Sequence, residues 1–209
     1  MTRKHLQFLF LPIILFAQGK EERVLNELVA YKDIIVQTAN NFSISPRVIA
    51  SVIYTERFLN YNWEDDLLDE LFAETGYNSS IGFGQIKPNT AFFIEQELHN
   101  PQSKYFLGNN IQTIAKRSKS KKEIIGKLVN DTTNIYYCSA YLAMIRQRWS
   151  KLFLFQPQNE TGVLATLYSL GSIKFDGTER IPHSNPQMNY FGIKAQEFFD
   201  SFKLRDAFN

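Results

Sequence analysis

Apolar residues recur every three or four positions along most of this sequence, and this spacing is typical of amphipathic α-helices. Segment 21–42 shows it, and so does segment 43–59, where Ser45 is suited to cap a helix that begins at Pro46. No alternating run is long enough to predict a strand. With 209 residues, 44% of them hydrophobic, the chain can bury one core. The sequence therefore predicts a single, mainly α domain.

The same spacing predicts further helices along the chain. Asp131 is placed to cap one of them, and Gly171 is placed to end another. The expected ranges are 62–75, 88–98, 120–130, 132–152, 161–171 and 185–202.

The first 19 residues differ from the rest. A short basic segment precedes an apolar run of about 11 residues, and small residues follow at Ala17 and Gly19, which is the pattern of a secretory signal peptide. The run is shorter than the roughly 20 residues that a membrane-spanning helix needs. We expect residues 1–19 to be a signal peptide and residues 20–209 to be an exported domain, periplasmic or extracellular, without stable membrane insertion. An uncleaved membrane anchor is the alternative.

Charge and residue types argue against several kinds of site. Without residues 1–19 the chain has 21 basic and 21 acidic residues, so a surface for nucleic acid is not implied. The basic run 116–122 is expected to be a solvated loop, and contact with an anionic polymer is its alternative. Cys138, the single cysteine, lies in an apolar helical context, and the three histidines are scattered. We expect no metal and no cofactor.

The stretch SSIGFGQIKPNTA, residues 79–91, contains two glycines in close succession. Gly82 and Gly84 would weaken a strand, and each allows another group to approach the backbone closely. Gln85 carries both a hydrogen-bond donor and an acceptor. One interpretation is a backbone that approaches a ligand. The other is a tight bend packed on the core, with Gln85 capping backbone groups.

Glu56 lies near the end of the helix predicted for 43–59. A carboxyl group at the end of an apolar helix can be partly desolvated, which raises its pKa and keeps a proton for general acid catalysis. The alternative is a surface glutamate paired with Arg57 or Lys87. Tyr168, in the apolar segment 161–171, can similarly be a half-buried core residue.

Taken in order, these features resemble the soluble lytic transglycosylase family of the lysozyme-like superfamily. A helix ends in Glu56, the segment GFGQIKPNTA follows, then a helix with Tyr168 and a last helix that carries a tyrosine. The central segment is the most specific part, and the resemblance covers roughly residues 43–200. It implies a lysozyme-like single domain with a cleft beside the end of the catalytic helix.

The resemblance also implies a reaction and a site. A monomer would cleave the β-1,4 bond between N-acetylmuramic acid and N-acetylglucosamine in the glycan strand of peptidoglycan and leave a 1,6-anhydro end. The implied roles are Glu56 as the single acid/base, Gln85 in a sugar subsite, Ser80, Gly82 and Phe83 along the same wall, and Tyr168 facing the glutamate.

Three departures from the family pattern leave alternatives open. Arg57 stands where a serine is usual, and Ser169 replaces an asparagine that contacts the ligand. About ten additional residues separate Glu56 from the glycine segment. A non-catalytic wall-binding protein on the same fold is therefore one alternative.

The acids of the insertion provide a second alternative. They alternate with leucines at helical spacing, which a solvated helix face explains. One of them could instead activate water as the second carboxylate of a hydrolytic lysozyme- or chitosanase-like glycosidase. These acids are Glu64, Asp65, Asp66, Asp69, Glu70 and Glu74.

Overall fold

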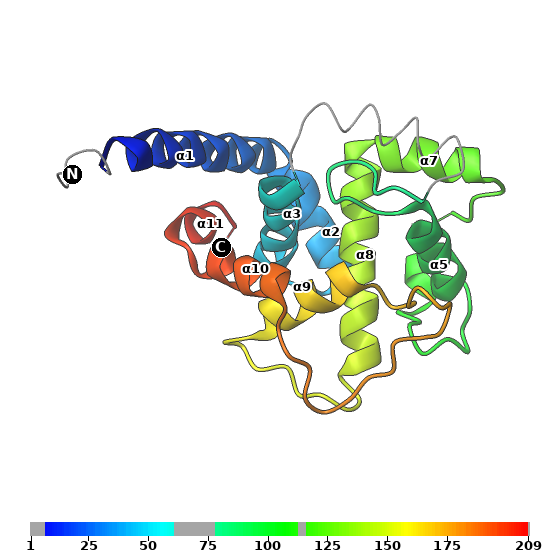
Figure 1. The fold of residues 1–209 in the computed structure, drawn as a ribbon. Coiled ribbons are helices and arrows are strands. Elements are labelled where there is room, and N and C mark those ends of the chain that lie inside the picture. Colours follow the sequence, from blue (N-terminus) through cyan, green and yellow to red (C-terminus); the bar gives the residue numbers. More distant parts are fainter. Residues whose placement is uncertain (1–6, 61–77, 113–115, 209) are drawn as a thin grey trace.

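The computed structural model describes residues 7–60, 78–112 and 116–208, and the side chains of 19–59, 78–112 and 116–208. These ranges are mainly α-helical (Figure 1), which confirms the fold class predicted from the spacing of apolar residues. Two isolated antiparallel bridges are the only β-pairings within them, between Ile81 and Ile86 and between Ile173 and Glu179. The helices are α1 (Gln7–Ala30), α2 (Lys32–Phe42), α3 (Pro46–Asn60), α5 (Pro88–Leu98), α6 (Asn109–Gln112), α7 (Lys121–Val129), α8 (Asp131–Trp149), α9 (Glu160–Leu170), α10 (Tyr190–Asp200) and α11 (Phe202–Phe208).

Helix α8 lies at the centre of the molecule (Figure 1). Helices α2, α3, α5, α7 and α9 all contact it, and α10 packs on α3 and α9. Most of α8 between residues 134 and 145 is buried, which is why apolar and small residues occupy nearly every face of this helix rather than one stripe. Side chains of α8 therefore pack against neighbouring elements on nearly all sides of the helix.

Several helix boundaries agree with the sequence analysis. Helix α3 begins at Pro46, and the carbonyl of Ser45 accepts hydrogen bonds from the backbone N–H groups of residues 48 and 49. Helix α5 has the predicted bounds, and α9 ends before Gly171, whose φ is 75°. The helix predicted for 62–75 lies outside the described residues.

Two boundaries near α8 correct the predictions. Segment 21–42 is divided at Tyr31 into α1 and α2, and the Tyr31 hydroxyl donates to the Asp131 carboxylate at 2.6 Å. Asn130, and not Asp131, caps α8: its Oδ1 accepts from the backbone N–H of Thr133 at 3.0 Å. Asp131 is the first helical residue, where its negative charge complements the helix dipole.

The C-terminal region also differs from its prediction. Helix α10 begins at Tyr190 and not near residue 185, because the side chain of Asn189 caps it by accepting from the N–H of Gly192 at 2.9 Å. The chain then turns at Ser201 and forms the additional helix α11.

Helix α1 continues without a break through residues 19 and 20, and its N-terminal part extends beyond the rest of the molecule (Figure 1). From Glu21 onward it contacts the body of the domain. The Glu21 carbonyl accepts from the Tyr54 hydroxyl at 3.1 Å, the Glu21 carboxylate pairs with Lys203 at 2.9 Å, and Val24 and Leu28 are fully buried. Within the described part of the chain, no helix is both long and apolar enough to cross a membrane.

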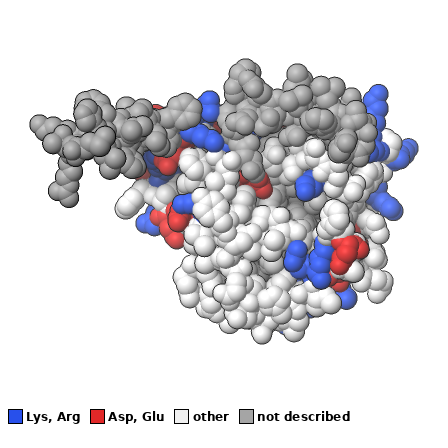
Figure 2. All heavy atoms as spheres, viewed as in Figure 1, with Lys and Arg blue, Asp and Glu red and all other residues white. Residues whose placement is uncertain are grey.

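The basic run 116–122 is largely exposed; residues 116–120 are non-helical, as expected for a solvated loop, whereas Lys121 and Lys122 begin α7. Lys and Arg side chains gather at the α7 edge of the molecule in Figure 2. Beneath the run lies Glu95 of α5, which is only 2% exposed. Its carboxylate accepts from the Ser118 N–H at 2.5 Å, the Tyr137 hydroxyl at 2.5 Å and Lys127 Nζ at 2.9 Å. Glu95 therefore fastens the basic run to α5, α7 and α8.

Burial by itself raises the pKa of Glu95, but the hydrogen bonds from Ser118, Tyr137 and Lys127 outweigh it and hold the pKa below the usual 4.5. A lowered pKa in the folded state stabilises the protein above pH 4.5, and this contribution is lost as the pH falls through the lowered value. We expect Glu95→Gln to lower the free energy of unfolding by about 2 kcal/mol at pH 7. The difference from wild type should shrink below pH 4.5.

Urea unfolding of both proteins across this pH range measures the effect. Glu22→Gln is the control, because Glu22 is exposed on α1. A difference that stays constant as the pH falls would contradict a role for the charged form of Glu95.

Candidate active site

The glycine segment forms a tight turn. Ile81 and Ile86 exchange two backbone hydrogen bonds, of 3.0 and 3.1 Å, and enclose residues 82–85. Gly82 has a φ of 71° and Gln85 a φ of 53°, in the left-handed region that non-glycine residues rarely adopt. The Gln85 N–H and its side-chain amide both donate to the Gly82 carbonyl, at 3.0 and 3.1 Å. Gln85 thus caps the turn, as one of the two interpretations of the sequence expected.

Asn134 of α8 holds this turn in place. Its Oδ1 accepts from the Gly84 N–H at 2.7 Å, and its Nδ2 donates to the carbonyls of Ile81 at 2.7 Å and Leu128 at 2.8 Å. The side chain is fully buried. These bonds give the buried Gly84 N–H and Leu128 carbonyl a partner, and they add a second bond to the Ile81 carbonyl, which also accepts from the Ile86 N–H.

The groups that closely approach the two glycines belong to the protein. A Cβ on Gly82 would lie 2.3 Å from the Leu128 carbonyl oxygen and 2.4 Å from Asn134 Nδ2. A Cβ on Gly84 would lie 3.0 Å from both Asn134 Oδ1 and the Cys138 Cβ. The segment is therefore a bend packed on the core, and the glycines allow α8 to approach it.

We expect Gly82→Ala to lower the free energy of unfolding by about 2–3 kcal/mol, because the added methyl group meets backbone at a residue with positive φ. Gly126→Ala is a matched control, since a Cβ at Gly126 in α7 meets nothing within 4 Å. Removing a glycine from a helix there should stabilise by about 0.5–1 kcal/mol. Urea unfolding curves compare the two, and equal effects would contradict the packing explanation.

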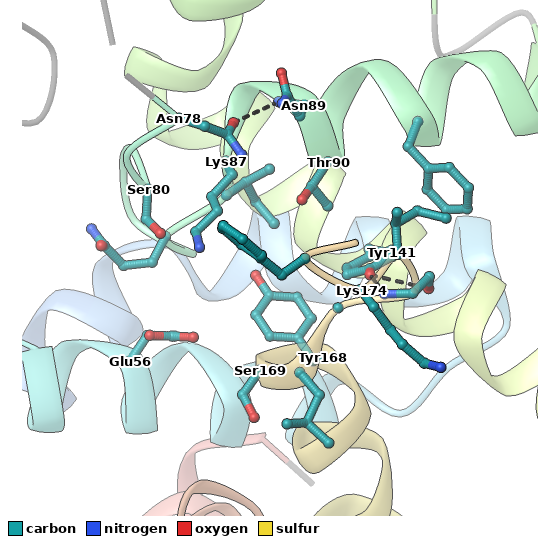
Figure 3. A pocket seen from close by; sticks show the side chains of 18 of the residues that line it. Glu56, Asn78, Ser80, Lys87, Asn89, Thr90, Tyr141, Tyr168, Ser169 and Lys174 are labelled. Carbon is teal, nitrogen blue, oxygen red and sulfur yellow. Dashed lines mark hydrogen bonds between the residues drawn. The ribbon is translucent and has the colours of Figure 1, made fainter. Parts of the chain in front are cut away.

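Glu56 lies in the last turns of α3, where the backbone carries it to the edge of a cleft. It is 7% exposed, so it is not the surface glutamate that the alternative interpretation required. Figure 3 shows its carboxyl group pointing toward Tyr168 of α9.

Tyr168 connects the glutamate to the turn. Its hydroxyl donates to the Gly84 carbonyl at 2.5 Å, so Gly84 is held by Asn134 on one side and Tyr168 on the other. Burial raises the pKa of Tyr168 well above its usual value, and the nearby Cys138 and Glu56 raise it further. The phenol therefore remains protonated at neutral pH and keeps its hydrogen bond to the Gly84 carbonyl.

Cys138 lies beneath this group and is fully buried. Burial raises the pKa of its thiol to about 12. A thiol with so high a pKa is not a nucleophile at neutral pH, so Cys138 is a core residue, as expected.

The cleft has a volume of about 880 Å³. Most of its wall comes from the end of α3, residues 78–93, and the end of α9 with the residues that follow it, and α8 and α10 add Tyr141 and Phe191. Figure 3 shows Glu56 on one side and Ser80 and Lys87 across from it, with Ser169 beyond Tyr168. The side chain of Asn78 accepts from the Asn89 N–H at 3.0 Å and shapes the upper wall.

Of the seven residues predicted for the site, five line this cleft and two do not. Glu56, Ser80, Gln85, Tyr168 and Ser169 lie along its walls. Gly82 faces α8, as described above, and Phe83 is 4% exposed and packs against the Tyr31 ring, with centroids 4.9 Å apart.

Arg57 and Ser169, the two residues that depart from the resembled motif, have structural partners. The Arg57 guanidinium donates to Glu27 of α1 from Nε at 3.3 Å and Nη2 at 3.2 Å, and it lies 5.3 Å from the centroid of the Phe83 ring. Ser169 Oγ donates to the Thr166 carbonyl at 2.9 Å and accepts from Asn189 Nδ2 at 3.0 Å. Arg57 thus ties α1 to α3, and Ser169 ties α9 to the start of α10.

Among the described residues that line the cleft, Glu56 alone carries a carboxyl group, and Lys87 and Lys174 carry the amines. The insertion acids lie outside the described residues. No group of three or more His, Cys, Asp or Glu in the described chain is arranged to hold a metal ion. The described site thus offers one carboxyl group for proton transfer, in a cleft whose walls also carry hydroxyl, amide and amine groups.

Sequence reasoning did not find Asn134 or the lining residues Asn78, Lys87 and Thr90. Asn134 had one signal, a polar side chain within the apolar segment NIYYCSAYLAMI. Such a residue in a buried helix must find hydrogen-bond partners.

No protein-family model matches the chain, and a search of curated protein sequences finds no relative.

Proposed function

We propose that this protein is an exported lytic transglycosylase that cleaves the β-1,4 bond between N-acetylmuramic acid and N-acetylglucosamine in peptidoglycan. One observation carries the proposal: Glu56, 7% exposed, is the single carboxyl group among the described residues of a large cleft and points toward Tyr168. A reaction that uses one residue first as acid and then as base needs this arrangement, whereas glycoside hydrolysis ordinarily uses a pair of carboxyl groups.

The proposed reaction has two proton transfers. Protonated Glu56 donates to the glycosidic oxygen, and the bond between this oxygen and the anomeric carbon of N-acetylmuramic acid breaks. The Glu56 carboxylate then accepts the proton of the 6-hydroxyl of the same sugar, whose oxygen bonds to the anomeric carbon. The products are a 1,6-anhydro end and a free 4-hydroxyl, no water is consumed, and Glu56 regains its proton.

Tyr168 and Gln85 act as positioning residues in this proposal. Tyr168 fixes the turn beside the glutamate through Gly84, and Gln85 is held by the Gly82 carbonyl at the cleft wall. Polar side chains at Asn78, Ser80 and Thr90 offer donors and acceptors to hydroxyl and acetamido groups.

Two further parts of the proposal concern the fold and the location. The helix α3, which carries Glu56 in its last turns, lies near a capped turn and the tyrosine-bearing helix α9, and this arrangement supports a lysozyme-like fold. An exported domain beginning at residue 20 would retain the contacts of Glu21, Val24 and Leu28 with the body.

Digestion of purified peptidoglycan by residues 20–209, with the products read by mass spectrometry, tests the proposal. We expect products that end in 1,6-anhydro-N-acetylmuramic acid. Reducing ends, heavier by one water, would show hydrolysis and direct attention to the acids of 62–75. Sedimentation with the wall without any cleavage would show a binding protein.

A further inference from the structure

The residues after α9 form a short hairpin at the cleft, residues 172–179. Ile173 and Glu179 form its antiparallel bridge, and the Lys174 N–H donates to the Thr178 carbonyl at 2.8 Å. Its turn is closed by the Gly177 N–H, which donates to the Lys174 carbonyl at 3.0 Å, with a φ of 80° at Gly177. Asp176 accepts from the N–H of Thr178 at 2.9 Å. The tip of the hairpin thus has a defined conformation.

The base of the hairpin is fixed to the core. The Glu179 carboxylate accepts from Arg148 Nε of α8 at 2.7 Å and from the Tyr105 hydroxyl at 3.1 Å. Ser172 donates its N–H to the Tyr141 hydroxyl at 2.6 Å. The hydrogen bond from Arg148 holds the pKa of Glu179 below its usual value, so the anchor is charged at neutral pH.

Phe175 lies at the tip of this anchored hairpin with its side chain fully exposed, and it lines the same cleft as Glu56. Burying a phenylalanine side chain is worth about 1.5–3 kcal/mol, and Phe175 contributes none of this to the core. Leu170 and Ile173, 45% and 43% exposed, line the cleft with it. The cleft therefore has an apolar strip, Leu170, Ile173 and Phe175, at and after the end of α9, whereas segment 78–90 contributes polar residues to its wall.

We infer that Phe175 is an aromatic platform for a pyranose ring, at a subsite other than the one where the bond is cut. A pyranose ring carries C–H groups on its faces and polar groups around its rim. The apolar strip suits a ring face, and the polar wall suits the rim. Phe175 comes from the hairpin after α9 and Glu56 from α3, so a glycan strand that crosses the cleft can contact both with different rings. The inference rests on the proposed function for its substrate, a glycan strand.

We expect Phe175→Ala to raise the substrate concentration for half-maximal cleavage of long glycan strands by about fivefold to tenfold. The maximal rate, and cleavage of the shortest fragment that is cut, should stay within about twofold of wild type, because the platform contacts a distal ring. Phe175→Trp should restore tight binding. Phe202→Ala is the matched control: Phe202 on α11 is 77% exposed and is not among the described lining residues.

A binding measurement separates this inference from the proposed chemistry. In Glu56→Gln protein that also carries Phe175→Trp, peptide-free glycan strands should shift the emission of the new tryptophan to shorter wavelength. The spectrum of Glu56→Gln alone is subtracted. Weakened glycan binding by Phe175→Ala supports the platform even if the wild type cleaves nothing, which would refute only the transglycosylase. Normal cleavage with an unchanged half-maximal concentration in Phe175→Ala overturns the platform alone. If no glycan binds Glu56→Gln protein, the platform and the proposed substrate fail together.

Discussion

Glu56→Gln is expected to lower the rate of glycan cleavage by about 10³-fold or more, since general acid–base catalysis contributes about 10²–10⁴-fold and Glu56 would serve in both proton transfers. The amide has nearly the shape of the carboxyl group but transfers no proton. Release of soluble fragments from purified peptidoglycan measures the rate. Binding to the wall should persist, because the polar and apolar walls of the cleft are unchanged.

The stability of the Glu56→Gln protein provides the control. A buried carboxyl group is costly in its charged form, so replacing it with a neutral amide should leave the urea midpoint unchanged or raise it. Substantial cleavage by a stably folded Glu56→Gln protein would contradict the proposal, and the acids of 62–75 would then be the candidates for catalysis.

Asn134→Ala is expected to have the largest effect on stability, lowering the free energy of unfolding by about 3–5 kcal/mol. The substitution leaves the Gly84 N–H and the Leu128 carbonyl without this partner, and each buried unsatisfied group costs about 1–3 kcal/mol. It also removes one of the two hydrogen bonds of the Ile81 carbonyl, which still accepts from the Ile86 N–H. Urea unfolding at pH 7 measures the loss. Because the turn carries Gln85 and meets Tyr168, cleavage should fall in the folded fraction as well.

Asn40→Ala is a suitable comparison for Asn134→Ala. Asn40 lies exposed on α2, so its removal should change the free energy of unfolding by no more than about 0.5 kcal/mol. A loss below about 1 kcal/mol for Asn134→Ala would contradict the view that this side chain holds the turn.

The sequence by itself determined the helical class and many helix ends, because these depend on local properties. Pro46 and Pro88 begin helices as their fixed φ and missing N–H favour, and Gly171 follows the end of α9. Local signals were insufficient where two neighbouring residues competed for one role, as Asn130 and Asp131 did at the start of α8. The side chain with the better reach to the Thr133 N–H became the cap.

For the candidate site, the resemblance selected five residues that lie together on the cleft, although the reaction itself remains a proposal. What approaches Gly82 and Gly84 was decided only by the tertiary structure. The approaching groups are Asn134, which lies 50 residues after Gly84, together with the Leu128 carbonyl and Cys138. Neither the periodicity nor the composition of the sequence predicts this contact, because a glycine allows the close approach of a ligand and of a neighbouring helix equally well. The packing of α8 against the turn decides it, since Asn134 of α8 gives the buried Gly84 N–H its partner.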